Sequence, residues 1–400
     1  MRFFVMLGML LVIAGLLGWA NYRLLARRFA GYRKPAVRYT YLGVTVAAVV
    51  IMVVTRTQNL SPHNPGDEML YWLLYLALAW LFGQCFLILL QVVVYAVEWL
   101  AGRFQSQPEG LPAEQAVLSR RSFINGVAAV LPVVSVGTGL KGIYEAQVEM
   151  QVQQYSLTFP GLAEELRGFK IAQFSDTHLG PYFSLDRLDA VIRLIQEQKP
   201  DVVVMTGDFA DDVHLLEPAF ERLDALVPLI PQGIYFCIGN HEYIRGAEKF
   251  RAAIAKSKAV LLDNTSRLIV NGPQPLYLLG VDYPGSDMTR SALDISTSRR
   301  QEYFASANDN IPAHAFKILL AHHPDFLFDS FAAQIPLTLA GHTHGGQVIV
   351  AGKSLLDNHA YMRGLYQENG VYGYVNSGAG HWFPLRLGCP PEISIFTLQA

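Results

Sequence analysis

The chain has 400 residues, of which 52% are hydrophobic and 16% are charged, and its formal net charge is −2. This length suits two domains, and the apolar excess indicates that one part is embedded in a membrane. The nearly neutral charge lacks the basic excess of a nucleic-acid-binding protein, so we expect no nucleic-acid partner.

Four uncharged apolar stretches define a predicted transmembrane region over residues 1–140. They cover residues 3–20, 39–55, 69–97 and 122–140. The first three reach the roughly 17–20 residues that are needed to cross the hydrocarbon. The third is too short for two spans and suits one tilted or kinked helix. The fourth is the weakest, because Pro132 and several glycines interrupt it.

The basic residues predict which connections lie in the cytoplasm. Residues 21–38 carry six Lys or Arg side chains, 56–68 carry one, and 98–121 carry three. Short loops rich in Lys and Arg stay in the cytoplasm, so the first and third connections are predicted there, including a linker at 101–121. If 122–140 crosses, the N-terminus and everything after Lys141 are extracytoplasmic. We therefore expect a multi-pass protein of the cell (inner) membrane.

Arg120 and Arg121 directly precede the fourth apolar stretch, within Ser119-Arg120-Arg121-Ser122-Phe123-Ile124. This segment resembles a twin-arginine export signal, which serves folded proteins. The alternative is that two arginines merely flank a span. The stretch 3–20 does not fit a cleaved signal peptide, because its positive charges follow the apolar run.

The remainder, about residues 150–400, is a predicted soluble domain in which strand-like runs alternate with helix-like segments. Residues 184–198 place Leu185, Leu188, Ile192 and Ile195 on one helical face, with Ser184 as the N-cap. A second helix is predicted at 217–229. Strands are predicted at 169–175, 201–206, 233–238, 275–281, 316–321, 336–340, 346–350, 372–376 and 392–398. This alternation predicts an α/β fold.

Polar motifs directly follow five of these strands. They are Asp176-Thr177-His178, Gly207-Asp208, Gly239-Asn240-His241-Glu242, His322-His323-Pro324 and Gly341-His342-Thr343-His344-Gly345-Gly346. Binding sites of α/β sheets form at the carboxyl ends of strands, so these motifs are predicted to converge. Oxygen and nitrogen donors without thiolates suit Mn, Fe, Zn or Co. Seven donors are too many for one ion and suit two ions that share one ligand.

Together these motifs resemble those of the calcineurin-like metallophosphoesterase superfamily, D-x-H, G-D, G-N-H-[DE], H and G-H-x-H, in the same order. The phrase from Gly341 to Gln347, and the tail around Pro384–Glu392, are similar to a branch of membrane-associated phosphodiesterases with twin-arginine signals. The resemblance implies a four-layer fold of two packed mixed β-sheets flanked by helices. One departure is the segment 377–381, where an Arg-Gly-rich sequence is expected.

The resemblance also implies a role for each motif residue. Asp176, His178 and His344 would hold one divalent or trivalent metal ion, Asn240, His322 and His342 a second, and Asp208 would bridge both. A metal-bridging hydroxide would attack phosphorus, and His241 would protonate the leaving group without binding metal.

Other polar residues receive plainer interpretations. His323 is expected to diverge from His322, because side chains alternate along a strand. His63, His214 and His314 are expected at the surface, and His359 and His381 could border the cleft. Asp211 and Asp212 are interpreted as helix-start charges, and Glu242 as a brace for the site. Arg363 and Arg386 are assigned either to phosphate or to structural pairing. Cys85 is expected to be a buried hydrophobe, and a Cys237–Cys389 disulfide is an alternative to free thiols.

The preferred function is a membrane-anchored phosphodiesterase that hydrolyses envelope or lipid-linked phosphoesters. A phosphomonoesterase or a lipid-linked pyrophosphatase would use the same metals, and a non-catalytic membrane scaffold is the alternative outside enzymes. The spans contain no ionisable group, so anchoring is preferred over presentation of a lipid substrate within the membrane.

Overall fold

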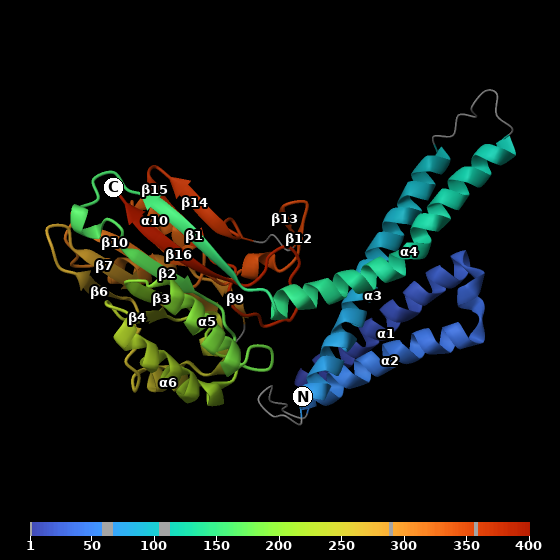
Figure 1. Ribbon diagram of the computed structural model, residues 1–400, viewed down its shortest axis with the longest axis horizontal. Helices are drawn as coiled ribbons and strands as arrows, with labels where there is room; N and C mark the ends of the chain where they lie inside the picture. The colour runs from blue at the N-terminus through green and yellow to red at the C-terminus, as the bar shows by residue number, and fades with distance from the viewer. Residues whose placement is uncertain (1, 58–66, 104–112, 288–290, 356–358) are drawn as a thin grey trace. The chain divides into compact units, whose positions relative to one another are not determined.

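The computed structural model describes residues 2–57, 67–103, 113–287, 291–355 and 359–400, without the side chains of 2–7, 10, 56–57, 113–121, 286–287 and 291–294. The chain divides into two compact units, Met1–Tyr144 and Glu145–Ala400 (Figure 1). The first is helical, and the second contains both β-sheets.

Long helices build the first unit. They are α1 (Arg2–Arg28), α2 (Pro35–Thr57), α3 (Glu68–Arg103) and α4 (Ala113–Gln147). Within the described residues, Pro35–Thr55, Glu68–Arg103 and Ser122–Gln147 are long and apolar enough to cross a membrane. Helix α1 covers the predicted span 3–20, although the side chains of its first turn lie outside the described residues. Most of the predicted loop 56–68, with His63, also lies outside them.

Helix α4 differs from the prediction, since its helical backbone begins at Ala113, inside the expected linker 101–121. Pro132 does not interrupt it. A Cβ at Gly139 would lie only 2.4 Å from the carbonyl oxygen of Ala79, so this glycine permits close packing of α3 against α4. The helices are also joined by a buried amide network, in which Asn21 donates to Gln84 Oε1 at 3.0 Å. Such polar contacts fix the register of apolar helices.

The second unit contains two six-stranded mixed sheets (Figure 1). The first sheet has the order β1 (Gln151–Thr158), β16 (Glu392–Gln399), β2 (Lys170–Phe174), β3 (Val202–Thr206), β4 (Ile234–Cys237) and β5 (Val260–Leu261). The second has the order β14 (Gly364–Glu368), β15 (Val371–Val375), β11 (Leu337–Ala340), β10 (Phe316–Leu320), β7 (Leu276–Gly280) and β6 (Thr265–Val270). Two small hairpins pair β8 (Gly285–Asp287) with β9 (Ser291–Ile295), and β12 (Ile349–Val350) with β13 (Lys353–Ser354).

The helices of this unit cover the outer faces of the sheets. They are α5 (Leu185–Gln198), α6 (Leu216–Leu226), α7 (Asn240–Arg245), α8 (Ala247–Ile254), α9 (Thr297–Ala307) and α10 (Phe326–Ala332). Side-chain alternation along β3 shows the layering, because Val202 and Val204 join the core between the sheets while Val203 and Met205 join the core beneath α5, α6 and α8. Helices α9 and α10 contribute to the cores on the second sheet. The predicted four-layer α/β fold is confirmed.

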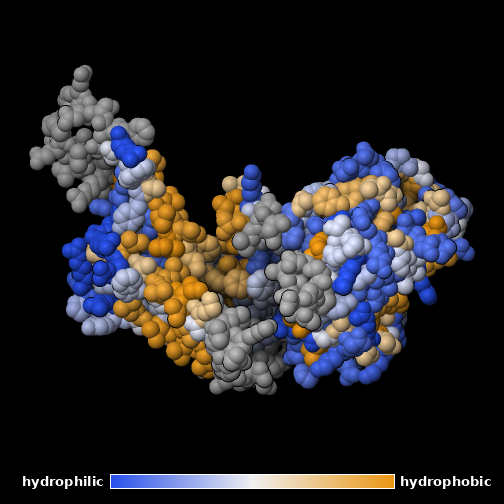
Figure 2. All heavy atoms as spheres, turned by 180° about the vertical axis from the view of Figure 1, so that it is seen from behind, coloured by the Kyte–Doolittle hydropathy of each residue, from blue (hydrophilic) through white to orange (hydrophobic). Residues whose placement is uncertain are grey.

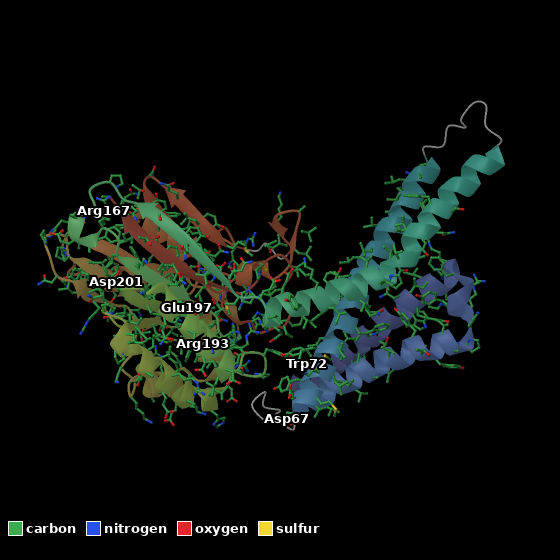
Figure 3. The ribbon with its side chains drawn as sticks, in the orientation of Figure 1. Asp67, Trp72, Arg167, Arg193, Glu197 and Asp201 are labelled. Atoms are coloured by element: carbon green, nitrogen blue, oxygen red, sulfur yellow. The ribbon has the colours of Figure 1, made fainter. Side chains whose placement is uncertain are left out.

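Helix α5 shows how the sequence specifies this packing. Ser184 Oγ accepts the Arg187 N–H at 3.3 Å, which is the predicted N-cap. Leu188 is buried against the sheet, whereas Arg193 and Glu197 lie on the exposed face (Figure 3). The helix is therefore amphipathic with the period of 3.6 residues that its sequence predicted.

Several expectations need correction. Strands β1, β5, β6 and β14 were not predicted, and the run predicted at 346–350 is a strand only at Ile349–Val350. The helix predicted at 217–229 ends as α6 at Leu226 and continues as a 3₁₀ turn containing Pro228. All three cysteines are free, and Cys85 is exposed on α3 instead of buried.

Candidate metal centre

The five motifs lie together because they follow strands that run in parallel. Strands β2, β3 and β4 are parallel neighbours in the first sheet, and β10 and β11 are parallel neighbours in the second. Their carboxyl ends therefore meet at one edge of the sandwich. All seven predicted donor residues come from the loops and helix starts that follow these strands, namely Asp176, His178, Asp208, Asn240, His322, His342 and His344.

The backbone at five of these residues is left-handed. The φ angles are 51° at Asp176, 49° at His178, 57° at Asp208, 76° at His342 and 50° at His344. Positive φ is uncommon outside glycine, although Asp and His tolerate it better than most residues. Local strain of this kind concentrates at functional sites, where the surrounding fold maintains it.

A neighbouring glycine allows one of these loops to pack tightly. At Gly207, φ is +87°, and a Cβ there would lie 2.6 Å from Nδ1 of His322. Any side chain at this position would displace the imidazole ring. This explains physically why a glycine precedes Asp208.

The first group of donors consists of Asp176, His178 and His344, which are all buried. The Nε2 atoms of His178 and His344 lie 3.0 Å apart, and Nε2 of His344 is 3.6 Å from Oδ1 of Asp176. Burial lowers the pKa of His344 well below its usual range, so this ring is neutral and can offer a lone pair. Two imidazoles and a carboxylate converging in this way fit a bound cation.

The second group consists of Asn240, His322 and His342. Oδ1 of Asn240 lies 3.0 Å from both Nε2 of His322 and Nδ1 of His342, and these two ring nitrogens are 3.1 Å apart. Burial lowers the pKa of His342 as well. An amide oxygen and two ring nitrogens thus form a second donor set.

Asp208 lies between the two groups. Its Oδ2 atom is 3.6 Å from Nε2 of His178 and 3.2 Å from Nε2 of His322. Burial opposes ionisation of this carboxyl, but the neighbouring histidines outweigh burial and hold its pKa well below the usual range. A carboxylate in this position can contact a cation in either group.

Glu242 holds the backbone of Asp208 in place through hydrogen bonds. Its carboxylate accepts backbone N–H groups from Asp208 at 3.0 Å, Phe209 at 2.7 Å and Gly239 at 2.8 Å. These bonds fix the two loops that follow β3 and β4 relative to each other. The geometry agrees with the expected bracing role.

His241 stands beside the donors and pairs with Asp211. Its Nδ1 atom is 2.6 Å from Oδ1 of Asp211. Burial opposes protonation, but the charges of Asp208 and Asp211 outweigh it and raise the pKa of His241 to about 9. The interpretation of Asp211 as a helix-start charge was wrong, whereas Asp212 does cap a 3₁₀ turn by accepting the His214 N–H at 3.0 Å. The spacing Asp208-x-x-Asp211 was the available signal.

Among the described residues, the remaining histidines lie either at the surface or beside the donor groups. His214 and His314 are exposed, as expected. The ring of His323 lies 4.8 Å from that of His342 and 5.1 Å from that of His359. His323 therefore lies beside the second donor group, next to His342, and β10 ends at Leu320, before the strand alternation reaches it.

Arg386 is a structural residue of the tail. It is fully buried, and its guanidinium donates to the carbonyl oxygens of Ser377 at 2.6 Å and Cys389 at 3.2 Å, and also to that of Gly380. Its Nη2 atom lies 3.0 Å from Nδ1 of His344. Arg363 is exposed and donates to the carbonyl oxygen of Gly388 at 3.2 Å. Both arginines thus bond to the backbone of the tail.

The sandwich of two mixed sheets, with oxygen and nitrogen donors at its edge, defines the class of metal-dependent phosphoesterases. Residues 169–346 match the family of calcineurin-like phosphoesterases. The chain is 31% identical to the uncharacterized metallophosphoesterase YkuE of Bacillus subtilis, over 71% of this chain and 98% of that protein. It is 30% identical to an uncharacterized metallophosphoesterase of Aquifex aeolicus, over 62% and 92% respectively.

The name of a third relative describes a transmembrane protein. The chain is 28% identical to the transmembrane protein with metallophosphoesterase domain of Bos taurus, over 80% of this chain and 72% of that protein. The chain belongs to the calcineurin-like phosphoesterase family, whose members use a site for two metal ions.

Proposed function

We propose that the chain is a membrane-anchored phosphodiesterase. The observation that carries this proposal is the convergence of two donor groups on Asp208, with the His241–Asp211 pair beside them. In this proposal, Asp176, His178 and His344 hold one metal ion, Asn240, His322 and His342 hold the other, and Asp208 contacts both. Mn, Fe, Zn and Co all suit such donors.

Two bound cations would neutralise charge on the phosphoryl oxygens and lower the pKa of water. The residues of this chain would position the phosphorus atom and supply a proton. Because Nδ1 of His241 contacts Asp211, Nε2 is the ring nitrogen that can deliver a proton to the leaving oxygen. Asp211 keeps the ring oriented and protonated.

A lipid-linked or envelope phosphoester is the proposed substrate class. Glu145 and Gln147, at the end of α4, belong to the catalytic unit. Glu145 Oε2 accepts the Gly388 N–H at 2.7 Å, and Gln147 Nε2 lies 2.9 Å from Nε2 of His381. The tail of the catalytic unit is thus bonded to Glu145 and Gln147, in the segment with which this unit begins.

Apolar side chains are exposed next to these contacts. Trp382, which follows His381, is 52% exposed, and Val350 in the β12–β13 hairpin is 59% exposed. The hairpin is joined to the tail by the Ile349 N–H, which donates to the carbonyl oxygen of Leu387 at 2.8 Å. Tryptophan is enriched at membrane–water interfaces. These side chains support a substrate that is taken from the membrane surface.

We also propose on which side of the membrane the catalytic unit lies and by which route it is exported. The positively charged first connection favours a catalytic unit outside the cytoplasm, and Arg120-Arg121 suits membership of the twin-arginine branch. Fusion of a reporter that is active only outside the cytoplasm to the C-terminus would test this orientation. A reporter that is active only in the cytoplasm is the matched control.

The activity is tested with full-length protein loaded with Mn. Hydrolysis of bis-p-nitrophenyl phosphate is measured beside the Asp208→Ala variant and beside p-nitrophenyl phosphate. Activity on the diester that is lost in the variant supports the proposal. Faster hydrolysis of the monoester would favour a phosphomonoesterase, and a metal-loaded protein inactive on both would contradict the proposal.

A further inference from the structure

A basic cavity lies in the helical unit, apart from the metal centre. It has a volume of about 370 Å³ and lies between the end of α1 and the start of α2. Four arginines line it, namely Arg23, Arg27, Arg33 and Arg38. Figure 2 shows hydrophilic residues gathered at the end of the helical unit where α1 and α2 are joined, next to an apolar flank.

No acidic side chain among the described residues balances the positive charge of this cavity. The chain has no Asp or Glu before Asp67, and among the described residues no carboxylate lies within 4.0 Å of the four guanidinium groups. By contrast, the charge of Arg28, which does not line the cavity, is balanced by Glu98 at 2.5 Å. Like charges that surround one cavity repel one another, so a bound anion would stabilise this arrangement.

Two of the guanidinium groups are held in place. Arg33 donates from Nε to the carbonyl oxygen of Ala26 at 2.8 Å and from Nη2 to that of Arg27 at 3.2 Å. These carbonyls belong to the last turn of α1 and have no partner within the helix. The guanidinium of Arg23 lies over the ring of Trp19, 5.3 Å from its centroid. The cavity is therefore built from positioned groups.

We propose that this cavity binds the phosphate of an anionic phospholipid head group. Guanidinium groups match phosphate oxygens in pairs of hydrogen bonds, and basic pockets between membrane helices bind such head groups. The apolar side chains of Trp19 and Leu42 complete the lining. The cavity adjoins α2, a candidate span, so a lipid could place its phosphate among the arginines and its chains along the apolar helices.

The test uses full-length protein in nanodiscs, with lipid retention measured by native mass spectrometry. Phosphatidylglycerol is compared with phosphatidylcholine, and we expect the wild-type protein to retain one phosphatidylglycerol with a preference of at least about tenfold. The preference should weaken as salt is raised. The Arg23→Gln/Arg27→Gln double variant should lose the preference for phosphatidylglycerol. If the double variant does not fold, the single variant Arg38→Gln is used instead, and it should show a reduced preference.

The matched control is Arg103→Gln. Arg103 also lies over a tryptophan, 4.3 Å from the centroid of Trp99, at the end of α3 and outside the cavity. The Arg103→Gln variant should keep the preference for phosphatidylglycerol. All variants should hydrolyse bis-p-nitrophenyl phosphate like the wild type, which shows that the protein is folded.

Three results would overturn the proposal. The first is equal retention of both lipids by the wild type. The second is a preference that survives loss of the cavity arginines or disappears equally in Arg103→Gln. The third is arginine-dependent binding of inorganic phosphate without any lipid preference, which would identify a soluble anion as the ligand.

Discussion

The Nδ1 atom of His241 lies 2.6 Å from Oδ1 of Asp211, and both residues follow the carboxyl ends of neighbouring strands, β4 and β3. The carboxylate therefore fixes which ring nitrogen faces the site and raises the pKa of the imidazole. In the proposed reaction, this pair supplies the proton for the leaving group.

Replacement of His241 by alanine should separate proton donation from metal binding. We expect turnover of diesters with alkoxide leaving groups to fall about 100- to 10,000-fold, with a much smaller loss for p-nitrophenolate, which needs no proton. Metal content, measured by plasma mass spectrometry, should stay normal. Loss of metal in this variant would show that His241 is a ligand instead.

The Asp211→Asn variant should change the dependence of activity on pH. The charge of Asp211 raises the pKa of His241, so its removal lowers that pKa. The proton donor is then lost at a lower pH, and the alkaline limb of the kcat profile should move down by about one to two pH units, since a hydrogen bond to a charged group contributes about 1.5–3 kcal/mol. Asp212→Asn is the control, and an unchanged limb in both variants would contradict the assignment.

Asp208 should be needed for a full complement of metal. Its carboxylate lies within 3.6 Å of donors from both groups, so Asp208→Ala should reduce the bound metal below two ions per chain. Activity should fall more than about a hundredfold. Chelation of the wild-type metals should have the same effect, and added Mn should reverse it. A variant that keeps two ions and full activity would exclude the bridging role.

Glu242 should matter for stability more than for the reaction itself. In Glu242→Ala, three buried backbone N–H groups lose their acceptor, and each unsatisfied group costs about 1–3 kcal/mol. The metal-free variant should therefore unfold at a clearly lower temperature in calorimetry. Exposed Glu248 offers a matched Glu248→Ala control, which should leave the transition unchanged.

Trp382 should affect only substrates that are embedded in a membrane. Trp382→Ala should leave hydrolysis of soluble bis-p-nitrophenyl phosphate unchanged and reduce turnover of a phosphodiester lipid in vesicles about tenfold, on the scale of about 1.5–3 kcal/mol for a buried apolar side chain. Leu229 is 63% exposed on a turn remote in sequence from the tail, so Leu229→Ala is the control. Equal turnover of the lipid by all three proteins would argue against contact with the membrane.

The sequence predicted the fold well where its signals were local. Strands β2, β3 and β4 are buried apolar runs with polar motifs behind them, and both features can be read directly. Edge strand β6 was missed because its residues are half-exposed and have no clear alternation. Strand β1 was missed for the same reason, as its single buried residue is Leu157.

The site was predictable to the same extent. Its donors follow strands, so convergence could be inferred from topology. The proximity of His323 to His359 could not, because it depends on where β10 ends and on a loop more than thirty residues later. The pairing of Asp211 with His241 also depends on side-chain direction, which a sequence pattern does not specify.

The left-handed backbone at Asp176, His178, Asp208, His342 and His344 is a strained conformation that the surrounding fold must maintain. A pocket organised in advance gives up little chain entropy when an ion arrives, so loading and release can occur without refolding. The metal-free protein should therefore keep its sheets, and the ion it carries in a cell should depend on which ions that compartment supplies as well as on affinity.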